Sequence, residues 1–279
     1  MKIGLCDDKG STFWAVLDVD AGTAHPIAGE FSEWAPRLTK DPNTKLSWAG
    51  DPLPLDGLRL LAPVPPGATV VATGATYAKH VAGLGLQMPK APSAFLKTFA
   101  TVIAPDDEIA YPEITTQLDY EGELVVVIGA KDVDPSDPAK SILGYTVGND
   151  VSARDQQFSG GVTGMDMFSA KALDRTSGIG PWIVTRDEFG DEHPDLELET
   201  TVDGERRQHD RTGSMVWGSA ELVAYVNARC RLHAGDAMFT GTCAGVGHED
   251  GRYLEPGQTV TVTIERIGSL KNVVGKKTN

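Results

Sequence analysis

The strongest constraint on the fold of this chain is the apolar run from Glu123 to Gly129, which reads Glu-Leu-Val-Val-Val-Ile-Gly. Its three valines and one isoleucine are β-branched, and such residues favour an extended strand over a helix. The run does not alternate with polar residues, so it predicts a strand that is buried on both faces. The chain therefore needs a sheet that is covered on both sides at this point.

Acidic residues stand directly before this strand, in the segment Asp119-Tyr120-Glu121-Gly122-Glu123. In an extended chain Glu121 and Glu123 point to the same face, so their carboxylates converge. Two adjacent carboxylates raise each other's pKa, and a hard divalent cation relieves this repulsion by taking oxygen ligands from both. Gly122 between them permits a close backbone approach. Taken alone, the pair also fits a strand with two acids that face solvent.

The rest of the chain reads mainly as strands separated by turns. The strands expected from apolar or alternating patterns are Thr12–Asp18, Thr69–Thr73 and Gln258–Arg266. The segments expected to be helical are Pro138–Leu143 and Ala220–Arg231. With 31 glycines and 17 prolines to form turns, this pattern predicts an α+β, β-rich fold.

A proline-rich stretch divides the chain near its first quarter. Residues 61–67 read Leu-Ala-Pro-Val-Pro-Pro-Gly, which is typical of a linker. The segment before it reads as short strands and turns. We therefore expect a small N-terminal domain over residues 1–67 and a larger catalytic domain over residues 68–279.

The charge of the chain excludes some classes of partner. With 39 acidic and 25 basic residues the net charge is -14, which repels nucleic-acid phosphates and anionic membranes. No apolar run approaches the roughly 18 residues of a membrane span, and no signal peptide is visible. The cysteines Cys6, Cys230 and Cys243 form no paired motif. These features predict a cytoplasmic protein.

Several motifs follow the acidic segment in chain order. They are Asn149-Asp150-Val151-Ser152-Ala153-Arg154-Asp155-Gln156, Phe168-Ser169-Ala170-Lys171, Gly180-Pro181-Trp182 and Phe239-Thr240-Gly241-Thr242. With the segment 119–123, their order and spacing resemble the fumarylacetoacetate hydrolase family from about Ala72 to Lys271. The resemblance implies a mixed β-roll core around a metal site, a small N-terminal domain and a homodimer.

The resemblance implies that Glu121, Glu123 and Asp150 hold Mg²⁺ or Mn²⁺. Three carboxylates leave about three octahedral positions for water and for a substrate that chelates the ion. A small 2-keto acid offers one carboxylate oxygen and one keto oxygen for this purpose. Such an ion acts as a Lewis acid toward the substrate.

The resemblance also assigns roles to residues around these carboxylates. The catalytic residues that it implies are His80, Arg154 and Lys171, and the substrate-binding residues are Tyr77, Lys97, Gln157, Gly241 and Thr242. Lys171 would balance negative charge on the substrate or on an attacking hydroxide. Arg154 also fits a surface or interface ion pair.

The segment Tyr77-Ala78-Lys79-His80 resembles the start of the family's mobile lid, whose histidine takes a proton from water. Many members have a glutamate three residues later that orients this histidine. Gly83 occupies that position, so we expect the histidine–glutamate pair to be broken. Thr76 replaces the usual asparagine, and Cys243-Ala244 replace the usual proline and lysine of the substrate loop, which leaves the substrate open.

Three functions remain after these comparisons of motifs. The leading one is hydrolysis of a carbon–carbon bond in an acylpyruvate-like 2,4-diketo acid, which gives pyruvate and a carboxylic acid. The alternative is a 2-keto acid lyase or isomerase, such as an oxaloacetate-type decarboxylase or a dehydratase of 3-deoxy-2-keto sugar acids. Gly83 favours this alternative because neither reaction needs a hydrolytic water. A catalytically silent metal-binding paralogue is the third, and the presence of Arg154 and Lys171 argues against it.

Overall fold

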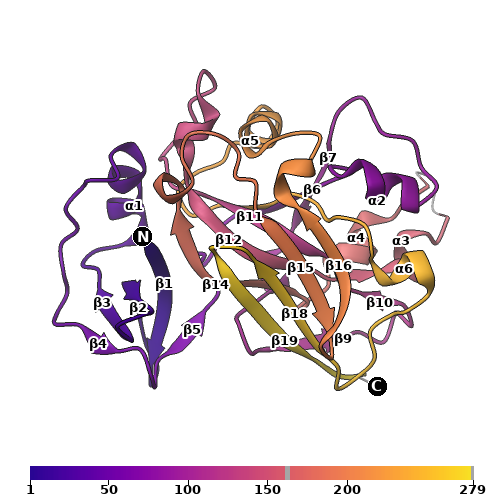
Figure 1. The fold of residues 1–279 in the computed structure, drawn as a ribbon, viewed down its shortest axis with the longest axis horizontal. Coiled ribbons are helices and arrows are strands. Elements are labelled where there is room, and N and C mark those ends of the chain that lie inside the picture. The colour runs from indigo at the N-terminus through magenta and orange to yellow at the C-terminus, as the bar shows by residue number, and fades with distance from the viewer. Residues whose placement is uncertain (161–163, 278–279) are drawn as a thin grey trace.

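The computed structural model describes residues 1–160 and 164–277. Its largest sheet, among these residues, has twelve strands (Figure 1). They are β1 (Lys2–Asp8), β2 (Ser11–Asp18), β3 (Thr23–Pro26), β4 (Leu53–Pro54), β5 (Arg59–Leu61), β6 (Val70–Gly74), β7 (Ser93–Lys97), β8 (Val102–Ile103), β11 (Gly122–Ile128), β12 (Ile142–Asp150), β14 (Ser177–Thr185) and β17 (Ala237–Phe239). The order is β4-β3-β2-β1-β14-β12-β11-β17-β6-β7, and β5 and β8 pair with β1 and β14.

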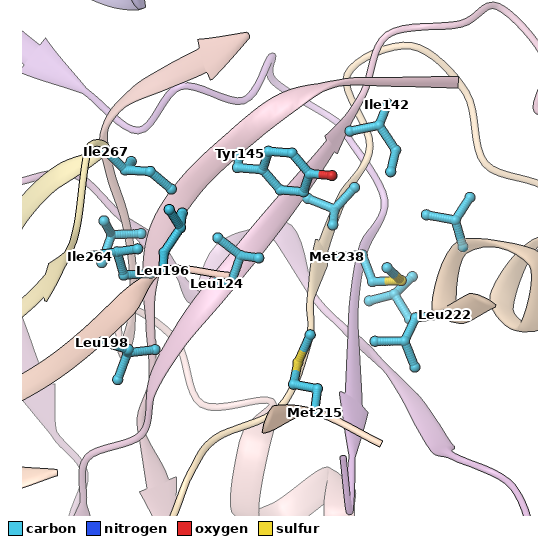
Figure 2. Packing of buried hydrophobic residues seen from close by; sticks show 14 of the residues in the cluster. Leu124, Ile142, Tyr145, Leu196, Leu198, Met215, Leu222, Met238, Ile264 and Ile267 are labelled. Atoms are coloured by element: carbon cyan, nitrogen blue, oxygen red, sulfur yellow. The ribbon is translucent and has the colours of Figure 1, made fainter. Parts of the chain in front are cut away.

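A second sheet of five strands packs against the first. Its strands are β9 (Glu108–Tyr111), β15 (Glu197–Val202), β16 (Glu205–Arg211), β18 (Thr259–Ile264) and β19 (Gly268–Lys277), in the order β16-β15-β18-β19-β9. A short pair is formed by β10 (Leu118–Asp119) and β13 (Ser152–Ala153). The main hydrophobic cluster joins both sheets, for example through Leu124, Tyr145, Leu198 and Ile264 (Figure 2). This burial of apolar side chains holds the two layers together.

Helices are short and lie mostly around the sheets. They are α1 (Phe31–Lys40), α2 (Ala78–Gly83), α3 (Arg154–Gln157), α4 (Met167–Lys171), α5 (Ser219–Asn227) and α6 (Gly247–Asp250), with 3₁₀ turns η1 (Phe99–Thr101), η2 (Pro138–Ser141), η3 (Arg186–Glu188) and η4 (Thr212–Ser214). The expected α+β, β-rich fold is confirmed. In the described part of the chain, no helix has the length and apolar character needed to span a membrane.

The strongest sequence pattern gives a strand that is buried along its whole length. All seven residues of β11 are buried, between β12 on one side and β17 on the other. In β18, Val260, Val262 and Ile264 are buried as their alternation predicts. The expected helix at 220–231 is present as α5 but ends at Asn227. The expected helix at 138–143 is only the turn η2, because the chain enters β12 at Ile142.

The region before residue 67 shares its sheet with the rest of the chain. Strand β1 pairs with β14, with Ile3 opposite Ile183. Ile3 and Trp34 are buried in one hydrophobic cluster with Val127 and Ile183. The helix α1 in this region was not expected from the sequence. The division into domains at residue 67 stays a prediction.

Candidate active site and metal centre

Three acidic side chains meet where β11 and β12 lie side by side. Glu123 lies on β11, Asp150 ends β12, and Glu121 directly precedes β11. The antiparallel register places Gly122 opposite Asn149 and so brings the ends of the two strands together. All three acids are buried, and their carboxylate oxygens lie within 4.8 Å of one another. The convergence expected from the spacing of Glu121 and Glu123 is confirmed.

Gly122 lets the second sheet come close to these acids. A Cβ atom at this position would lie 2.2 Å from Thr200 Oγ1 on β15. The Gly122 N–H donates a hydrogen bond to Gln208 Oε1 on β16 at 2.8 Å. A larger residue would therefore push β15 away from β11, and the close backbone approach expected from the sequence is confirmed.

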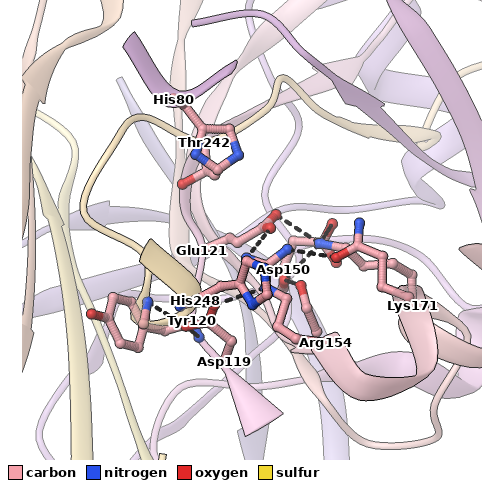
Figure 3. A network of polar contacts seen from close by, with 12 residues as sticks. His80, Asp119, Tyr120, Glu121, Asp150, Arg154, Lys171, Thr242 and His248 are labelled. Atoms are coloured by element: carbon pink, nitrogen blue, oxygen red, sulfur yellow. Dashed lines mark hydrogen bonds and ion pairs between the residues drawn. The ribbon is translucent and has the colours of Figure 1, made fainter. Parts of the chain in front are cut away.

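Two buried cations lie between the carboxylates (Figure 3). Lys171, which ends α4, places Nζ 2.6 Å from Glu121 Oε2 and 2.8 Å from Asp150 Oδ2. Arg154, which begins α3, places Nη2 2.6 Å from Glu121 Oε1 and donates from Nη1 to Gln157 Oε1 at 2.8 Å. Burial alone would raise the pKa of Glu121, but Lys171 and Arg154 hold this pKa below its ordinary value of 4.5. Because Arg154 is only 1% exposed, its ion pairs belong to the site and not to the surface.

Glu123 is the carboxylate that these cations leave uncompensated. It forms no ion pair with any residue that the structure describes, and its Oε2 accepts a hydrogen bond from the Gly241 N–H at 2.6 Å. Burial raises the pKa of Glu123 well above 4.5, and the charges of Asp150 and Glu121 raise it further. A divalent cation offsets this excess of negative charge, and three carboxylate donors suit a hard ion such as Mg²⁺ or Mn²⁺. The residues present therefore fit a metal site at Glu121, Glu123 and Asp150.

A histidine–glutamate pair borders the same cavity as the three carboxylates. His80 on α2 lines this cavity, and its Nδ1 lies 3.2 Å from Glu249 Oε1 on α6. Glu249 Oε2 also accepts a hydrogen bond from the Gly245 N–H at 3.1 Å, which fixes the carboxylate. Figure 3 shows His80 apart from the ion pairs of Arg154 and Lys171. The imidazole therefore has an acidic partner of its own.

Gly83 explains why this partner comes from α6. A Cβ atom at position 83 would lie 2.9 Å from Glu249 Cδ, so the two positions compete for the same space. No glutamate stands three residues after His80, as expected, but the expectation that the histidine–glutamate pair is broken is wrong, because the distant Glu249 supplies the carboxylate. Sequence reasoning looked near His80, whereas the partner lies 169 residues away. The available signal was a glycine at 83 together with an acid just after the glycine-rich segment 241–247.

The segment after β17 forms another wall of the cavity. Gly241 has a φ of +94°, and a Cβ atom there would lie 2.1 Å from Thr76 Oγ1. Thr76 donates to Thr240 O at 2.7 Å, so it anchors the chain that leads into α2. Thr242 Oγ1 donates to Gly122 O at 3.0 Å. Gly241 and Thr242 both line the cavity, and their contact with substrate stays a prediction.

Asp119 is a further buried acid that sequence reasoning did not assign to the site. Its Oδ2 accepts a hydrogen bond from Arg154 Nε at 2.8 Å. Its carboxylate also accepts from the N–H groups of Gly247 at 2.7 Å and His248 at 3.0 Å, where α6 begins. Asp119 thus ties Arg154 to the helix that carries Glu249. Its place in the motif 119–123 was the signal for it.

Comparison with known proteins identifies the family. A family model described as fumarylacetoacetate hydrolase, C-terminal, matches residues 69–275. The chain belongs to the fumarylacetoacetate hydrolase family. The resemblance that the motifs indicated and the β-rich family fold are therefore confirmed.

Relatives in this family carry different activities in their names. Protein Rv2993c of Mycobacterium tuberculosis is 42% identical over 280 residues, which are 99% of each chain. Oxaloacetate tautomerase YisK of Bacillus subtilis is 34% identical over 274 residues, 95% of this chain and 87% of the relative. The crystal structure of 2-hydroxyhepta-2,4-diene-1,7-dioate isomerase from Mycobacterium marinum matches with a TM-score of 0.80 and 35% identity, over 100% and 99% of the two chains.

Two residues expected to bind substrate, Tyr77 and Lys97, do not belong to the described lining of the cavity, and their role toward substrate stays a prediction. Tyr77 is buried in the main hydrophobic cluster and is bridged to Met215, away from the described lining of the cavity. Lys97 places Nζ 2.6 Å from Asp150 Oδ1 and donates to Lys171 O at 2.5 Å. Burial lowers the pKa of Lys97. Lys97 therefore holds Asp150 and the end of α4 in place.

Proposed function

We propose that this protein is a Mg²⁺- or Mn²⁺-dependent hydrolase of an acylpyruvate-like 2,4-diketo acid, which it splits into pyruvate and a carboxylic acid. The observation that carries the proposal is the 3.2 Å contact between His80 and Glu249 in the cavity that also holds the three buried carboxylates. Hydrolysis needs a base that activates water, and this pair supplies one. The reason for favouring a lyase, a histidine without its glutamate, no longer applies.

The chain's own residues divide the work of the reaction. A divalent cation bound by Glu121, Glu123 and Asp150 supplies Lewis acidity toward the 2-keto acid. Glu249 accepts the Nδ1–H of His80, which leaves Nε2 free to take a proton from water. The water oxygen then bonds to C4, the C3–C4 bond breaks, and its electron pair remains on C3 of the pyruvate fragment. C3 then takes the proton from His80, which gives pyruvate and frees the imidazole.

Three further groups prepare the cavity for this charge. Lys171 lies against both Glu121 and Asp150, so it offsets negative charge where the keto acid binds. Arg154 keeps Glu121 ionised through a 2.6 Å contact. Gly241 holds the Glu123 carboxylate by its N–H.

The proposal is tested by the products from a series of acylpyruvates. With Mg²⁺ present, we expect equal amounts of pyruvate and of the acid that matches the acyl group, identified by mass spectrometry. A chelator should stop both. If the enzyme consumes no acylpyruvate but still binds Mg²⁺, the hydrolase assignment fails.

An enol–keto isomerase is the second candidate. The same imidazole can carry a proton between C3 and the enol oxygen without a hydrolytic water, and two relatives are named as a tautomerase and an isomerase. This activity would exchange hydrogen for deuterium at C3 in D₂O without breaking the C3–C4 bond. Exchange without pyruvate release would favour the isomerase over the hydrolase.

We also propose a cytoplasmic homodimer. Large apolar side chains are exposed on β7, η1 and α4, with Leu96 at 61%, Phe99 at 37% and Phe168 at 77%. Such side chains are typical of surfaces that a second chain covers. The three cysteines form no disulfide, which agrees with a reducing compartment. Light scattering would give the mass of the assembly, and a monomer at micromolar concentration would contradict the proposal.

A further inference from the structure

Two chemically different sets of side chains line the cavity. One set holds the three carboxylates with Lys171 and Arg154. The other set, the apolar wall, comes from three separate segments of the chain. Its side chains are Val81, Leu84, Leu86 and Pro89 from α2 and the loop after it, Phe95 from β7, and Met167 from α4. The volume is about 300 Å³, enough for a keto acid with an attached chain.

The cations that reach this cavity are already engaged. Arg154 pairs with Asp119 and Glu121, and Lys171 pairs with Glu121 and Asp150. His80 lies against Glu249. Each cation that the described lining contributes is thus balanced by a carboxylate of this chain.

The polar groups near the apolar wall are neutral. The cavity lining there includes Gln87 and Ser93, which can hydrogen-bond but cannot neutralise a charge. Lys90 lies close in sequence and is exposed, but it does not belong to the described lining. A carboxylate placed against Val81, which is buried, and Leu84 would lose much of its water without gaining an ion pair, which is unfavourable.

We infer that the substrate carries an uncharged, apolar chain at the end remote from its 2-keto acid group, and that the cavity rejects a second carboxylate there. The inference rests on the proposed function only in taking a 2-keto acid as the group that binds near the carboxylates. Oxaloacetate and the heptadiene-dioate named for two relatives each have a second carboxylate. This chain therefore differs from them in the substrate that its cavity accepts.

Substituted oxamates test the inference by binding, without any turnover. N-butyloxamate and N-(3-carboxypropyl)oxamate share a metal-chelating head and differ in the end of the chain. Titration calorimetry of the full-length protein with saturating Mg²⁺ should give at least about tenfold tighter binding of the butyl compound. Each added methylene from ethyl to butyl should tighten binding by up to about fourfold.

A charge placed on the apolar wall should reverse the preference. Leu86 lines the cavity and is 47% exposed, so Leu86→Arg can be accommodated without repacking the core. We expect this variant to bind the carboxypropyl compound at least as tightly as the butyl compound. Ile114→Arg is the matched control, because Ile114 is 52% exposed and lies outside the described lining. It should keep the wild-type ratio.

The outcomes separate this inference from the proposed function. Equal or tighter wild-type binding of the carboxypropyl compound overturns the inference, as does the absence of binding by either oxamate. If the butyl preference holds but no diketo acid is cleaved, only the hydrolase proposal fails. If diketo acids are cleaved but those with a second carboxylate are preferred, only the inference fails.

Discussion

At the scale of single residues, the site depends on which of two positions, 83 or 249, supplies the carboxylate beside His80. Glu249 fills the space beside Gly83, and its carboxylate holds His80. Gly83 has no left-handed backbone conformation that would restrict it to glycine. Position 83 is therefore a glycine because the Glu249 carboxylate fills the space beside it, and not because of its backbone conformation. The glutamate that contacts His80 can thus come from position 83 or from position 249.

That either position can supply the glutamate predicts a rescue. Glu249→Gly should lower kcat by at least about tenfold. This loss should be smaller than the roughly hundred- to ten-thousandfold loss that is typical when the general base itself is removed. Adding Gly83→Glu to that variant should restore part of the rate. Gly83→Glu alone should impair the enzyme, since both carboxylates compete for one space. Asp250→Asn, on the same helix but paired with Arg252, is the control. A double variant no faster than Glu249→Gly would contradict the view that either position can supply the glutamate.

Glu123 gives the residue-scale prediction for the metal. Glu123→Gln keeps an oxygen for the Gly241 N–H but removes the charge that Asp150 and Glu121 repel. The metal-free variant should therefore unfold at a higher temperature than the metal-free wild type. The Mg²⁺ affinity of the variant should fall by more than about a hundredfold, because the loss of a residue that only hydrogen-bonds to a metal ligand can already lower metal affinity by up to about a hundredfold.

Thermal melts with and without Mg²⁺ measure both effects. Glu113→Gln, at an exposed position outside the acidic cluster, should behave as wild type. Unchanged Mg²⁺ affinity in Glu123→Gln would remove Glu123 from the metal site.

At the scale of elements, apolar patterning predicted four strands, which are β2, β6, β11 and β18, and the helix α5. The β-branched run gave β11, and the alternation at 259–264 gave β18, because burial on two faces or one face leaves a direct record in the sequence. Helix α1 was missed although Phe31, Trp34, Ala35 and Leu38 follow a helical repeat. Pro36 is the sixth of its ten residues, where a proline removes a backbone hydrogen-bond donor and so disfavours a helix in a reading of the sequence.

Of the carboxylate cluster, the pair Glu121 and Glu123 could be anticipated from its spacing, whereas Asp150 came only from the family resemblance, because its place depends on the pairing of β11 with β12. The contact between His80 and Glu249 could not, because it depends on how α6 packs beside α2. The same holds for Lys97, whose contact with Asp150 needs the pairing of distant strands. Local patterns record burial, whereas these contacts follow from the topology.

A contact of His193 with the start of α5 and with η4 predicts that the stability of the fold depends on pH. His193 Nδ1 accepts a hydrogen bond from the Ser219 N–H at the start of α5, and Nε2 lies 3.0 Å from Thr212 O. Burial lowers the pKa of His193 below 6.5. The unfolded chain then binds the proton more readily, so this contribution to stability is present above about pH 6.5 and is lost as the pH falls below it.

Urea unfolding at pH 7.5 and 5.5 measures this contribution. The loss on acidification should be smaller in His193→Gln than in the wild type, by at most about 1.4 kcal/mol per pH unit. The exposed His209, replaced by glutamine, serves as control. An identical pH dependence in His193→Gln and wild type would rule the effect out.

At the scale of the whole molecule, residues 1–67 extend the large sheet while the site lies in the remainder. The carboxylates, Arg154, Lys171 and Glu249 all belong to residues 68–279. Removal of the N-terminal region exposes Ile183 and the edge of β14, which Ile3 and β1 cover. We therefore expect the fragment 64–279 to melt at a lower temperature than the full chain but to keep its stabilisation by Mg²⁺.

Circular dichroism melts of this fragment with and without Mg²⁺ test the division. An unfolded fragment, or a folded one without a Mg²⁺ effect, would show that the N-terminal region belongs to the catalytic unit. The full chain at the same concentration is the reference.

The central claim is that His80, held by Glu249, activates a water that ends in the carboxylic acid product. The most direct measurement is the mass of that acid when the best acylpyruvate is cleaved in ¹⁸O water with Mg²⁺. We predict one ¹⁸O atom in the acid formed by the wild type. His80→Ala should lower kcat at least about a hundredfold and change Mg²⁺ affinity little. Cleavage that leaves the acid unlabelled, or a His80→Ala variant with nearly full activity, would contradict this account.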